Sequence, residues 1–248
     1  MIAVTLTAYN RPQYLRQTLD SLARCVGIDQ CLFLPQVEPA DDSVWEMVQT
    51  WAACPVEAQR NRKRLFLNRN TYTALDRAFH HPAQFTSFVH VEDDILLSRD
   101  ALQYFVWAIE QLRKSEKYLI VSAYSRPRNT VAPDERHLAA FRHVFTPIAW
   151  GIDRERLKFM LDQWSFRCPT KFTQAFRYRY SRKLLEIYPL LSRSETIGYE
   201  RASNPKSRRY YATHYDLRPD QLAQESDCGG SWKLDCDRPY CDLRTSIG

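Results

Sequence analysis

The chain lacks a hydrophobic run long enough to cross a membrane. No stretch of its 248 residues approaches the roughly 20 apolar residues that a membrane span requires. The opening residues, Met1 to Leu6, carry no basic segment and no cleavage site, so no secretory signal is predicted. Hydrophobic residues make up 44% and charged residues 26%, a globular composition that argues against disorder. We expect one large or two small folded domains.

The cysteines lack paired spacing. There are seven of them, an odd number, and a reduced cytoplasmic setting is the expectation. Periodicity is lost after Leu217, and residues 217–248 are expected to form an extension packed on the main domain. The cysteines of this extension are Cys228, Cys236 and Cys241. Their spacing is not a standard zinc pattern, and a zinc ion held with His214 or an aspartate is the alternative.

Positive charge exceeds negative charge, with 35 basic against 29 acidic residues. Basic residues crowd residues 60–69 and 177–209, and the second stretch is interleaved with tyrosines. Such patches attract nucleic acid, an anionic membrane surface or an anionic substrate. No nucleic-acid module surrounds them, so no nucleic-acid partner is expected. A pyrophosphate or a membrane-bound phospholipid acceptor fits equally well, and peripheral contact at the inner membrane surface is compatible with the second stretch.

Strand-like and helix-like segments alternate along the first half of the chain. The expected strands are residues 2–7, 31–35, 64–67, 85–91 and 118–123. Amphipathic helices are expected between them, the first beginning near Pro12. This alternation predicts an α/β fold, a three-layer α/β/α sandwich with a mostly parallel central sheet. Ligands bind beyond the carboxyl ends of such strands, where residues 8–10 and 92–94 fall.

Three consecutive acids, Glu92, Asp93 and Asp94, directly follow an apolar strand. Adjacent carboxylates repel one another and raise each other's pKa, so a cation is expected to neutralise them. Oxygen-only ligation suits a hard ion such as Mg²⁺ or Mn²⁺ that also binds phosphate oxygens. A solvated acidic turn is the alternative interpretation.

Three segments in this order resemble the GT-A-type nucleotide-sugar glycosyltransferases. VTLTAYNRPQYLRQTLDSL, residues 4–22, resembles the donor-binding start of the family-2-like enzymes. VHVEDDILLSRDALQYF, residues 89–105, resembles the Glu-Asp-Asp metal motif of N-acetylglucosaminyltransferase I and its bacterial relatives. SETIGYERAS, residues 194–203, resembles a segment near the end of their catalytic domain. The resemblance implies a Rossmann-like GT-A catalytic domain over residues 1–216, with residues 1–115 binding the donor and 116–216 the acceptor.

The resemblance also implies a set of donor-binding residues. They are Thr7, Ala8, Tyr9, Arg11, Glu38, Asn68, Glu92 and Asp93. Thr7, Ala8 and Tyr9 would line the nucleoside pocket, with core packing as the alternative for Tyr9. Glu38 would contact the base or ribose, with Asp41 and Asp42 as rivals. Asn68 would lie near the base or phosphates.

Asp94 would be the metal ligand and His214 a further contact to metal or pyrophosphate. Asp93 would touch the donor sugar or ribose, and Glu92 a second site on either. The ion would act as a Lewis acid on the leaving nucleoside diphosphate. For His214, an ordinary surface or core histidine is the alternative.

The acceptor side departs from the family pattern. The resemblance places Trp150 and Gly151 at the acceptor, although a core tryptophan is an equal alternative. Relatives carry an aspartate soon after this segment, but Ser165 follows Trp164 here. Asp162 is the predicted catalytic base, with Asp153 and Glu155 further back as the other nearby acids. A surface helix charge is the alternative interpretation of Asp162. A displaced base, a retaining mechanism and an impaired enzyme all stay open.

The sequence therefore predicts a metal-dependent, inverting glycosyltransferase of the hexosyl- or N-acetylhexosaminyl class. Its partners would be a UDP- or GDP-linked sugar and a glycan or lipid-linked acceptor. A sugar nucleotidyltransferase is one alternative, but that class opens with a glycine-rich phosphate loop and residues 8–12 contain no glycine. A non-catalytic nucleotide- or carbohydrate-binding module is the other.

Overall fold

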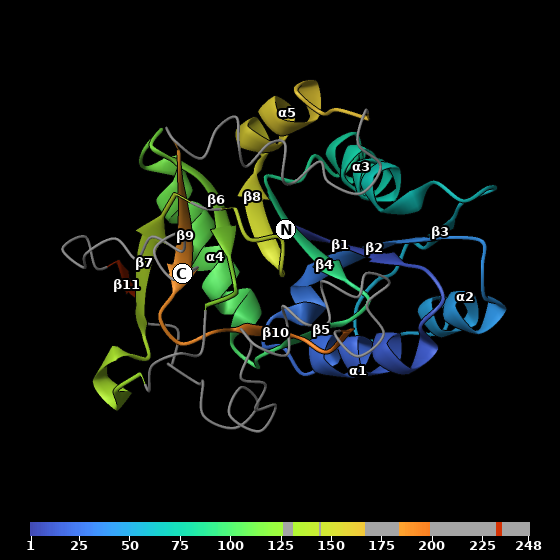
Figure 1. Cartoon of the computed structure of the whole chain (residues 1–248), viewed down its shortest axis with the longest axis horizontal. Helices are drawn as coiled ribbons and strands as arrows, with labels where there is room; N and C mark the ends of the chain where they lie inside the picture. Colours follow the sequence, from blue (N-terminus) through green and yellow to red (C-terminus); the bar gives the residue numbers. More distant parts are fainter. Residues whose placement is uncertain (126–130, 144, 167–183, 199–231, 235–248) are drawn as a thin grey trace, which may run out of the picture.

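A nine-stranded sheet divides the helices into two layers in the computed structural model (Figure 1). The structure describes residues 1–125, 131–143, 145–166, 184–198 and 232–234. The α-helices are α1 Pro12–Ala23, α2 Asp42–Gln49, α3 Phe66–Phe79, α4 Ala101–Arg113 and α5 Arg154–Asp162. Two short 3₁₀ turns cover Ile28–Gln30 and Pro133–Glu135. None of the helices in these ranges is long and apolar enough to span a bilayer.

The sheet is mostly parallel, as the alternation of elements predicts. Its strands are β11 Lys233–Leu234, β7 Leu138–Arg142, β9 Leu185–Pro189, β6 Tyr118–Ser122, β8 Trp150–Asp153, β4 Ser87–Glu92, β1 Ile2–Ala8, β2 Cys31–Val37 and β3 Gln59–Arg60, in spatial order. Strand β8 runs antiparallel to β4 and β6, and β7 runs antiparallel to β9. All other neighbours are parallel. The predicted three-layer α/β/α architecture is confirmed.

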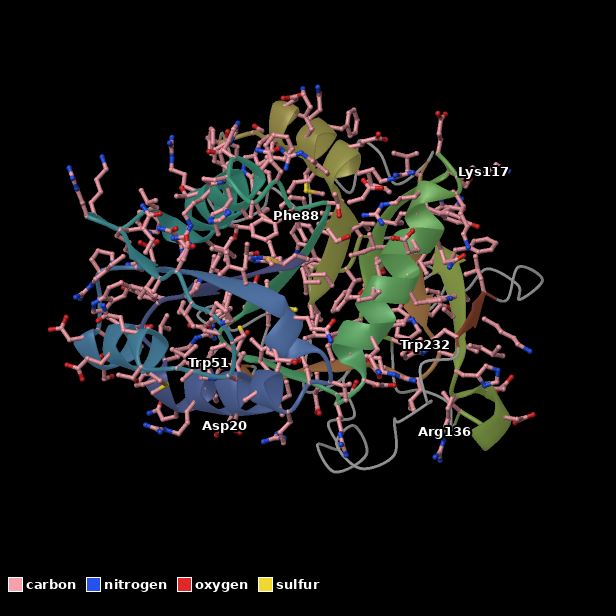
Figure 2. The ribbon with its side chains drawn as sticks, turned by 180° about the vertical axis from the view of Figure 1, so that it is seen from behind. Asp20, Trp51, Phe88, Lys117, Arg136 and Trp232 are labelled. Atoms are coloured by element: carbon pink, nitrogen blue, oxygen red, sulfur yellow. The ribbon has the colours of Figure 1, made fainter. Side chains whose placement is uncertain are left out.

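Alternating side chains of the central strands build two cores. From β1, Val4 and Leu6 pack toward α1, α2 and α4, while Ala3 faces the opposite layer with α3 and α5. Strand β4 does the same, with Val89 in the first core and Phe88 in the second; Figure 2 labels Phe88 on the side of α3. This period-2 division is what a sheet buried on both faces requires.

The strand registers bring three carboxyl ends to one edge of the sheet. Thr7 of β1 pairs with Glu92 of β4, and Ala8 pairs with Val37 of β2. The acidic triplet after β4, the loop after β1 and the loop after β2 therefore lie side by side. This is the edge at which parallel α/β sheets bind their ligands.

The strand expected over residues 64–67 is wrong. Helix α3 begins at Phe66, whose φ of 62° is incompatible with a strand, and the third strand is the two-residue β3. The backbone N–H of Leu65 donates to the Glu38 carboxylate instead of to a neighbouring strand. The β-like run at residues 64–67 therefore does not form a strand, because Leu65 bonds to Glu38 and a helix starts at the next residue.

Two smaller features complete the architecture. Strands β5 Ile95–Leu97 and β10 Ser194–Thr196 form a separate antiparallel pair beside α1 (Figure 1). Within the segment predicted as an extension, Trp232 is buried, and its ring centroid lies 6.2 Å from that of Trp107 on α4 (Figure 2). Strand β11 of the same segment pairs with β7 at the edge of the sheet. The predicted ligand His214 and the three cysteines after it lie outside the described residues.

Candidate functional site

Two buried carboxylates meet one guanidinium at the carboxyl edge of the sheet. Arg11, the residue before α1, donates from Nη1 to Asp94 Oδ2 at 2.7 Å and from Nη2 to Asp93 Oδ1. Asp93 is 3% exposed and Asp94 8%. The backbone N–H of Tyr9 donates to the second Asp93 oxygen at 3.1 Å. The loop after β1 and the triplet after β4 thus form a single polar cluster whose carboxylate oxygens converge on one cation.

Burial perturbs the ionisation of this cluster. It is the main cause that raises the pKa of Glu92 to about 8, with Asp94 and Asp93 adding to it. Burial also raises the pKa of Asp93 to about 6, although the Arg11 guanidinium acts in the opposite direction. Burial alone would lower the pKa of Arg11, but the two aspartates raise it, so the guanidinium stays charged. The negative charge of the triplet is therefore only partly compensated by the protein itself.

Gly198 closes the cluster from a distant part of the chain. Ile197 donates its backbone N–H to the Asp94 carbonyl at 2.8 Å, which sets the next residue against the Asp94 side chain. A Cβ added to Gly198 would lie 1.8 Å from Asp94 Oδ2 and 2.9 Å from Arg11 Nη1. Only glycine allows this approach. The resemblance covered this segment but assigned Gly198 no role, and the scarcity of glycine, six in the chain, was the available signal.

A buried ion pair fixes the strand pair that carries Gly198. Arg193 Nε donates to Asp100 Oδ2 at 2.9 Å, and both side chains are almost completely buried. The Arg193 carbonyl accepts from the Ser98 backbone at 3.0 Å. These contacts tie the start of β10 to the segment that leads from β5 into α4. The position of Gly198 against Asp94 therefore depends on contacts between two segments that lie about 100 residues apart in the sequence.

An aromatic and cationic stack flanks the acids on the side of β2. The Arg64 guanidinium lies 4.2 Å from the Tyr9 ring centroid and 4.5 Å from that of Phe66. Phe66 is 52% exposed and holds a positive φ, a strained backbone state that often marks functional sites. The sequence singled out Tyr9 but neither partner, although Arg64 belongs to the basic cluster 60–69. Arg64 thus places positive charge against two aromatic rings, next to the residue whose backbone N–H contacts Asp93.

Glu38 holds the loop that leads to this stack. Its carboxylate accepts from the Leu65 backbone at 2.9 and 3.0 Å and from Asn61 Nδ2 at 3.2 Å. Asn61 also donates to Asn70 Oδ1 and accepts from Gln36 Nε2. The side chain of Glu38 is thus committed to the protein, and its predicted contact with a base or ribose stays a prediction. Its rivals Asp41 and Asp42 lie at the start of α2, where Asp41 caps the helix.

Thr7 and Ala8 lie at the carboxyl end of β1, and their place in a nucleoside pocket stays a prediction. Ala8 is buried, and its carbonyl accepts from the Glu38 backbone at 2.9 Å. Thr7 Oγ1 is buried without a hydrogen-bond partner among the described residues. An unsatisfied buried hydroxyl is costly, so it marks a position where a ligand or water can be accommodated.

Trp150 and Gly151 lie in the core. Trp150 is 2% exposed and packs 5.4 Å from His90 and 5.6 Å from Phe145. A Cβ on Gly151 would meet Phe105 Cδ1 at 2.8 Å, so this glycine permits close packing of α4 on the sheet. The geometry favours the core interpretation of Trp150, and acceptor contact by either residue stays a prediction.

Asp162 and Asn68 belong to the interface between α3 and α5. Asp162, the last residue of α5, has a half-exposed side chain and forms an ion pair with Lys158 at 2.6 Å. Asn68 accepts from Trp164 Nε1 at 2.7 Å and donates to the Ser165 carbonyl at 2.9 Å. These bonds bring the stretch around Ser165 to the beginning of α3. The catalytic role of Asp162 and the donor contact of Asn68 remain predictions.

The site suits a hard divalent cation on three observations. Its donor set is carboxylate oxygen, its oxygens already converge on the Arg11 guanidinium, and burial of the acids is only partly compensated by that charge. Within the described ranges no group of three or more His, Cys, Asp or Glu side chains surrounds a single point. An ion here would therefore take further oxygens from a ligand such as a diphosphate.

Comparison with solved structures identifies the fold. Neither a protein-family model nor a curated protein matches the sequence. A mannosyltransferase from Pyrobaculum calidifontis, PcManGT, in complex with GDP-Man and Mn²⁺, superimposes with a TM-score of 0.56 at 18% identity, over 76% of this chain and 54% of that one. S. aureus TarS 1–349 gives 0.58 at 12% identity, over 89% and 68%. GalNAc-T7 with UDP, GalNAc and Mn²⁺ gives 0.56 at 11%, over 89% and 49%.

These neighbours share the α/β arrangement of this chain. At such identities the likeness shows the fold, which is of the GT-A type predicted from the sequence. The chain spans about half the length of the mannosyltransferase.

Proposed function

We propose that the chain is a metal-dependent glycosyltransferase that moves a sugar from a nucleoside-diphosphate sugar to a hydroxyl acceptor. The observation that carries this proposal is the pair of buried carboxylates, Asp93 and Asp94, that converge on the Arg11 guanidinium. They lie at the edge where sheets of the GT-A type bind ligands. Burying two adjacent acids is costly unless a ligand compensates for them. The neighbours PcManGT and GalNAc-T7 hold Mn²⁺ with GDP-Man or with UDP and GalNAc, which is the ligand combination proposed here.

Asp94 would ligate Mn²⁺ or Mg²⁺, and Asp93 and Glu92 would contact the donor sugar or ribose. When bound, the ion supplies Lewis-acid stabilisation of the leaving nucleoside diphosphate. The protein's own contribution is to hold both aspartates with buried hydrogen bonds and to keep Gly198 against the Asp94 carboxylate. Arg11 would provide positive charge for the phosphates. His214 would add a contact from the C-terminal side.

The nucleoside would lie along Tyr9 and the end of β1. The Tyr9 and Phe66 rings with Arg64 between them offer a surface for a base, UDP- and GDP-linked donors being equally compatible. Thr7 Oγ1 is a buried hydroxyl available to a ligand. The proposed division assigns donor binding to residues 1–115 and acceptor binding to 116–216, with 217–248 as an extension. Gly198, which belongs to the second part, lies against the side chain of Asp94, the proposed metal ligand.

The acceptor would be the hydroxyl of a glycan or a lipid-linked sugar, and transfer would be inverting with Asp162 as base. Peripheral membrane contact would come from the basic, tyrosine-rich residues 177–211. The stretch 58–75, with five basic residues and no acid, is a second candidate surface, and a solubilising face is its alternative. Phe66 and Leu67, in the middle of this stretch, are 52% and 48% exposed. Co-sedimentation with anionic but not with neutral vesicles tests this contact. Equal binding to both vesicle types, or none, would contradict it.

Calorimetric titration of UDP and GDP, each with and without Mn²⁺, tests the proposed function. Nucleotide binding is expected to require Mn²⁺ in the wild type and to be lost in Asp94→Asn. Asp20→Asn is the matched control, since Asp20 is an exposed aspartate on α1 (Figure 2). Nucleotide binding that ignores both Mn²⁺ and Asp94 would refute the proposal.

A non-catalytic nucleotide-binding module is the second candidate. It is favoured by Ser165, which stands where relatives carry an aspartate and whose carbonyl is hydrogen-bonded to Asn68. Donor-hydrolysis assays separate the two candidates. Metal-dependent binding with no turnover of UDP- or GDP-sugars, even with water as acceptor, would favour the module.

A further inference from the structure

Arg11 is the ionic partner of both aspartates at the proposed metal site. One guanidinium nitrogen contacts Asp94 and the other contacts Asp93, so each carboxylate receives its own charge-assisted hydrogen bond. Among the described residues, no other basic side chain forms an ion pair with either acid. The arginine therefore does in this state what a bound cation would do, which is to neutralise two buried like charges.

A divalent ion and this guanidinium would compete for the same two carboxylates. An oxygen ligand of Mg²⁺ or Mn²⁺ lies at about 2.1 Å from the ion, and Asp94 Oδ2 already accepts from Arg11 Nη1 at 2.7 Å. Two cations within this distance of one oxygen would also repel each other strongly in a site with little solvent. Ion binding is thus expected to displace the guanidinium.

The Arg11 side chain can move away from the aspartates while its backbone remains fixed. The Arg11 carbonyl accepts from the backbone of Tyr14 and Leu15 at 3.1 and 3.0 Å, which fixes it at the start of α1. Its side chain is 26% exposed, whereas both aspartates are far more buried. Its guanidinium lies 5.8 Å from the Tyr14 ring, on the same helix. The flexible stem can therefore swing toward solvent, where the donor phosphates would enter.

We infer that Arg11 is an exchangeable internal cation that occupies the acid pair without metal, is displaced by the divalent ion, and then pairs with the donor diphosphate. The inference rests on the proposed function and deepens it, because it makes metal and nucleotide binding cooperative. The ion alone must break two charge-assisted bonds, while the ion with a diphosphate gives the freed guanidinium a new partner. By linkage, nucleotide must strengthen metal binding as much as metal strengthens nucleotide binding.

Mn²⁺ binding without nucleotide is the test, measured by the electron paramagnetic resonance signal of the free aqueous ion. We expect weak binding by the wild type. Arg11→Gln should bind Mn²⁺ about 100- to 10,000-fold more tightly, because two charge-assisted hydrogen bonds no longer compete with the ion. Arg16→Gln, an exposed arginine on the same helix, should match the wild type. Adding UDP should tighten Mn²⁺ binding strongly in the wild type and much less in Arg11→Gln.

The possible outcomes separate the inference about Arg11 from the proposed function. Equal Mn²⁺ affinity in the wild type and Arg11→Gln would overturn the inference and leave the proposed function standing. No Mn²⁺ binding by any variant, with or without UDP, would overturn both. Should Arg11→Gln fail to fold, Arg11→Lys decides, since lysine keeps the charge but cannot reach two carboxylates in the same fork. An Mn²⁺ affinity of Arg11→Lys equal to that of the wild type would overturn the inference.

Discussion

Replacement of Gly198 by alanine should disable the proposed metal site without unfolding the protein. The added Cβ would lie 1.8 Å from Asp94 Oδ2, 2.6 Å from Asp94 Cγ and 2.9 Å from Arg11 Nη1. Carbon and oxygen atoms prefer contacts of about 3.5 Å, so the carboxylate has to move by more than about 1 Å. The carboxylate is the softest neighbour, because the backbone at Ile197 is held by its bond to the Asp94 carbonyl.

Overpacking of this kind costs about 1–3 kcal/mol. If the cost falls on the arrangement of Asp94, the affinity for UDP with Mn²⁺ should fall by about 5- to 150-fold. Calorimetric titration of both variants gives the ratio directly, and thermal unfolding monitored by circular dichroism shows whether the fold is retained.

Gly27→Ala is the matched control. A Cβ there meets nothing within 4 Å, but the φ of 89° makes any side chain strained. This variant should lose about 1–2 kcal/mol of stability and keep its nucleotide affinity. The reasoning would be refuted if Gly198→Ala bound UDP with Mn²⁺ within about twofold of the wild type while folding normally.

Two further predictions concern stability. Arg193→Leu should lower the free energy of unfolding by about 3–5 kcal/mol in urea titrations, because it leaves the Asp100 carboxylate buried without its charge partner. Lys158→Ala is the control, since it removes only an exposed ion pair and should cost about 1 kcal/mol or less. Similar losses of stability in both variants would contradict this account. His90 is buried, and burial lowers its pKa to about 3. Below pH 6.5 the unfolded chain therefore binds a proton at this histidine that the folded chain does not bind. The free energy of unfolding should fall by about 1.4 kcal/mol for each pH unit below 6.5. His90→Gln should remove that contribution between about pH 6.5 and 3, and the comparison with wild type cancels the opposite slopes of Glu92 and Asp93, whose pKa values are raised; identical pH dependence in both proteins would contradict the burial argument.

Local sequence was sufficient for most of the fold. The apolar runs of β1, β2, β4 and β6 and the helical spacing after Pro12 were enough to predict these four strands, α1 and a mostly parallel sheet, which the structure confirms. The failure at residues 64–67 has a local cause in part, since a four-residue apolar run cannot distinguish a strand from a helix start. The deciding contact, Leu65 with Glu38, spans 27 residues.

The acidic triplet was visible in the sequence because consecutive carboxylates after a strand are unusual in themselves. The parallel sheet then implied that the loop after β1 and the triplet after β4 share one edge, and the register of Thr7 with Glu92 bears this out. What kind of cation faces the acids in the absence of ligand was not visible. The ion pairs of Arg11 with Asp93 and Asp94 join positions 82 and 83 residues apart.

The sequence by itself determined the class of fold and placed the acidic triplet at the carboxyl edge of the sheet, because periodicity and strand ends are properties of contiguous residues. Only the tertiary structure decided that Gly198 touches Asp94, that Arg64 lies between Tyr9 and Phe66, and that Trp150 is buried beside His90. Such contacts depend on how strands from distant parts of the chain are ordered and how closely their side chains pack. Tens of residues of intervening chain leave no local trace of that packing in the sequence.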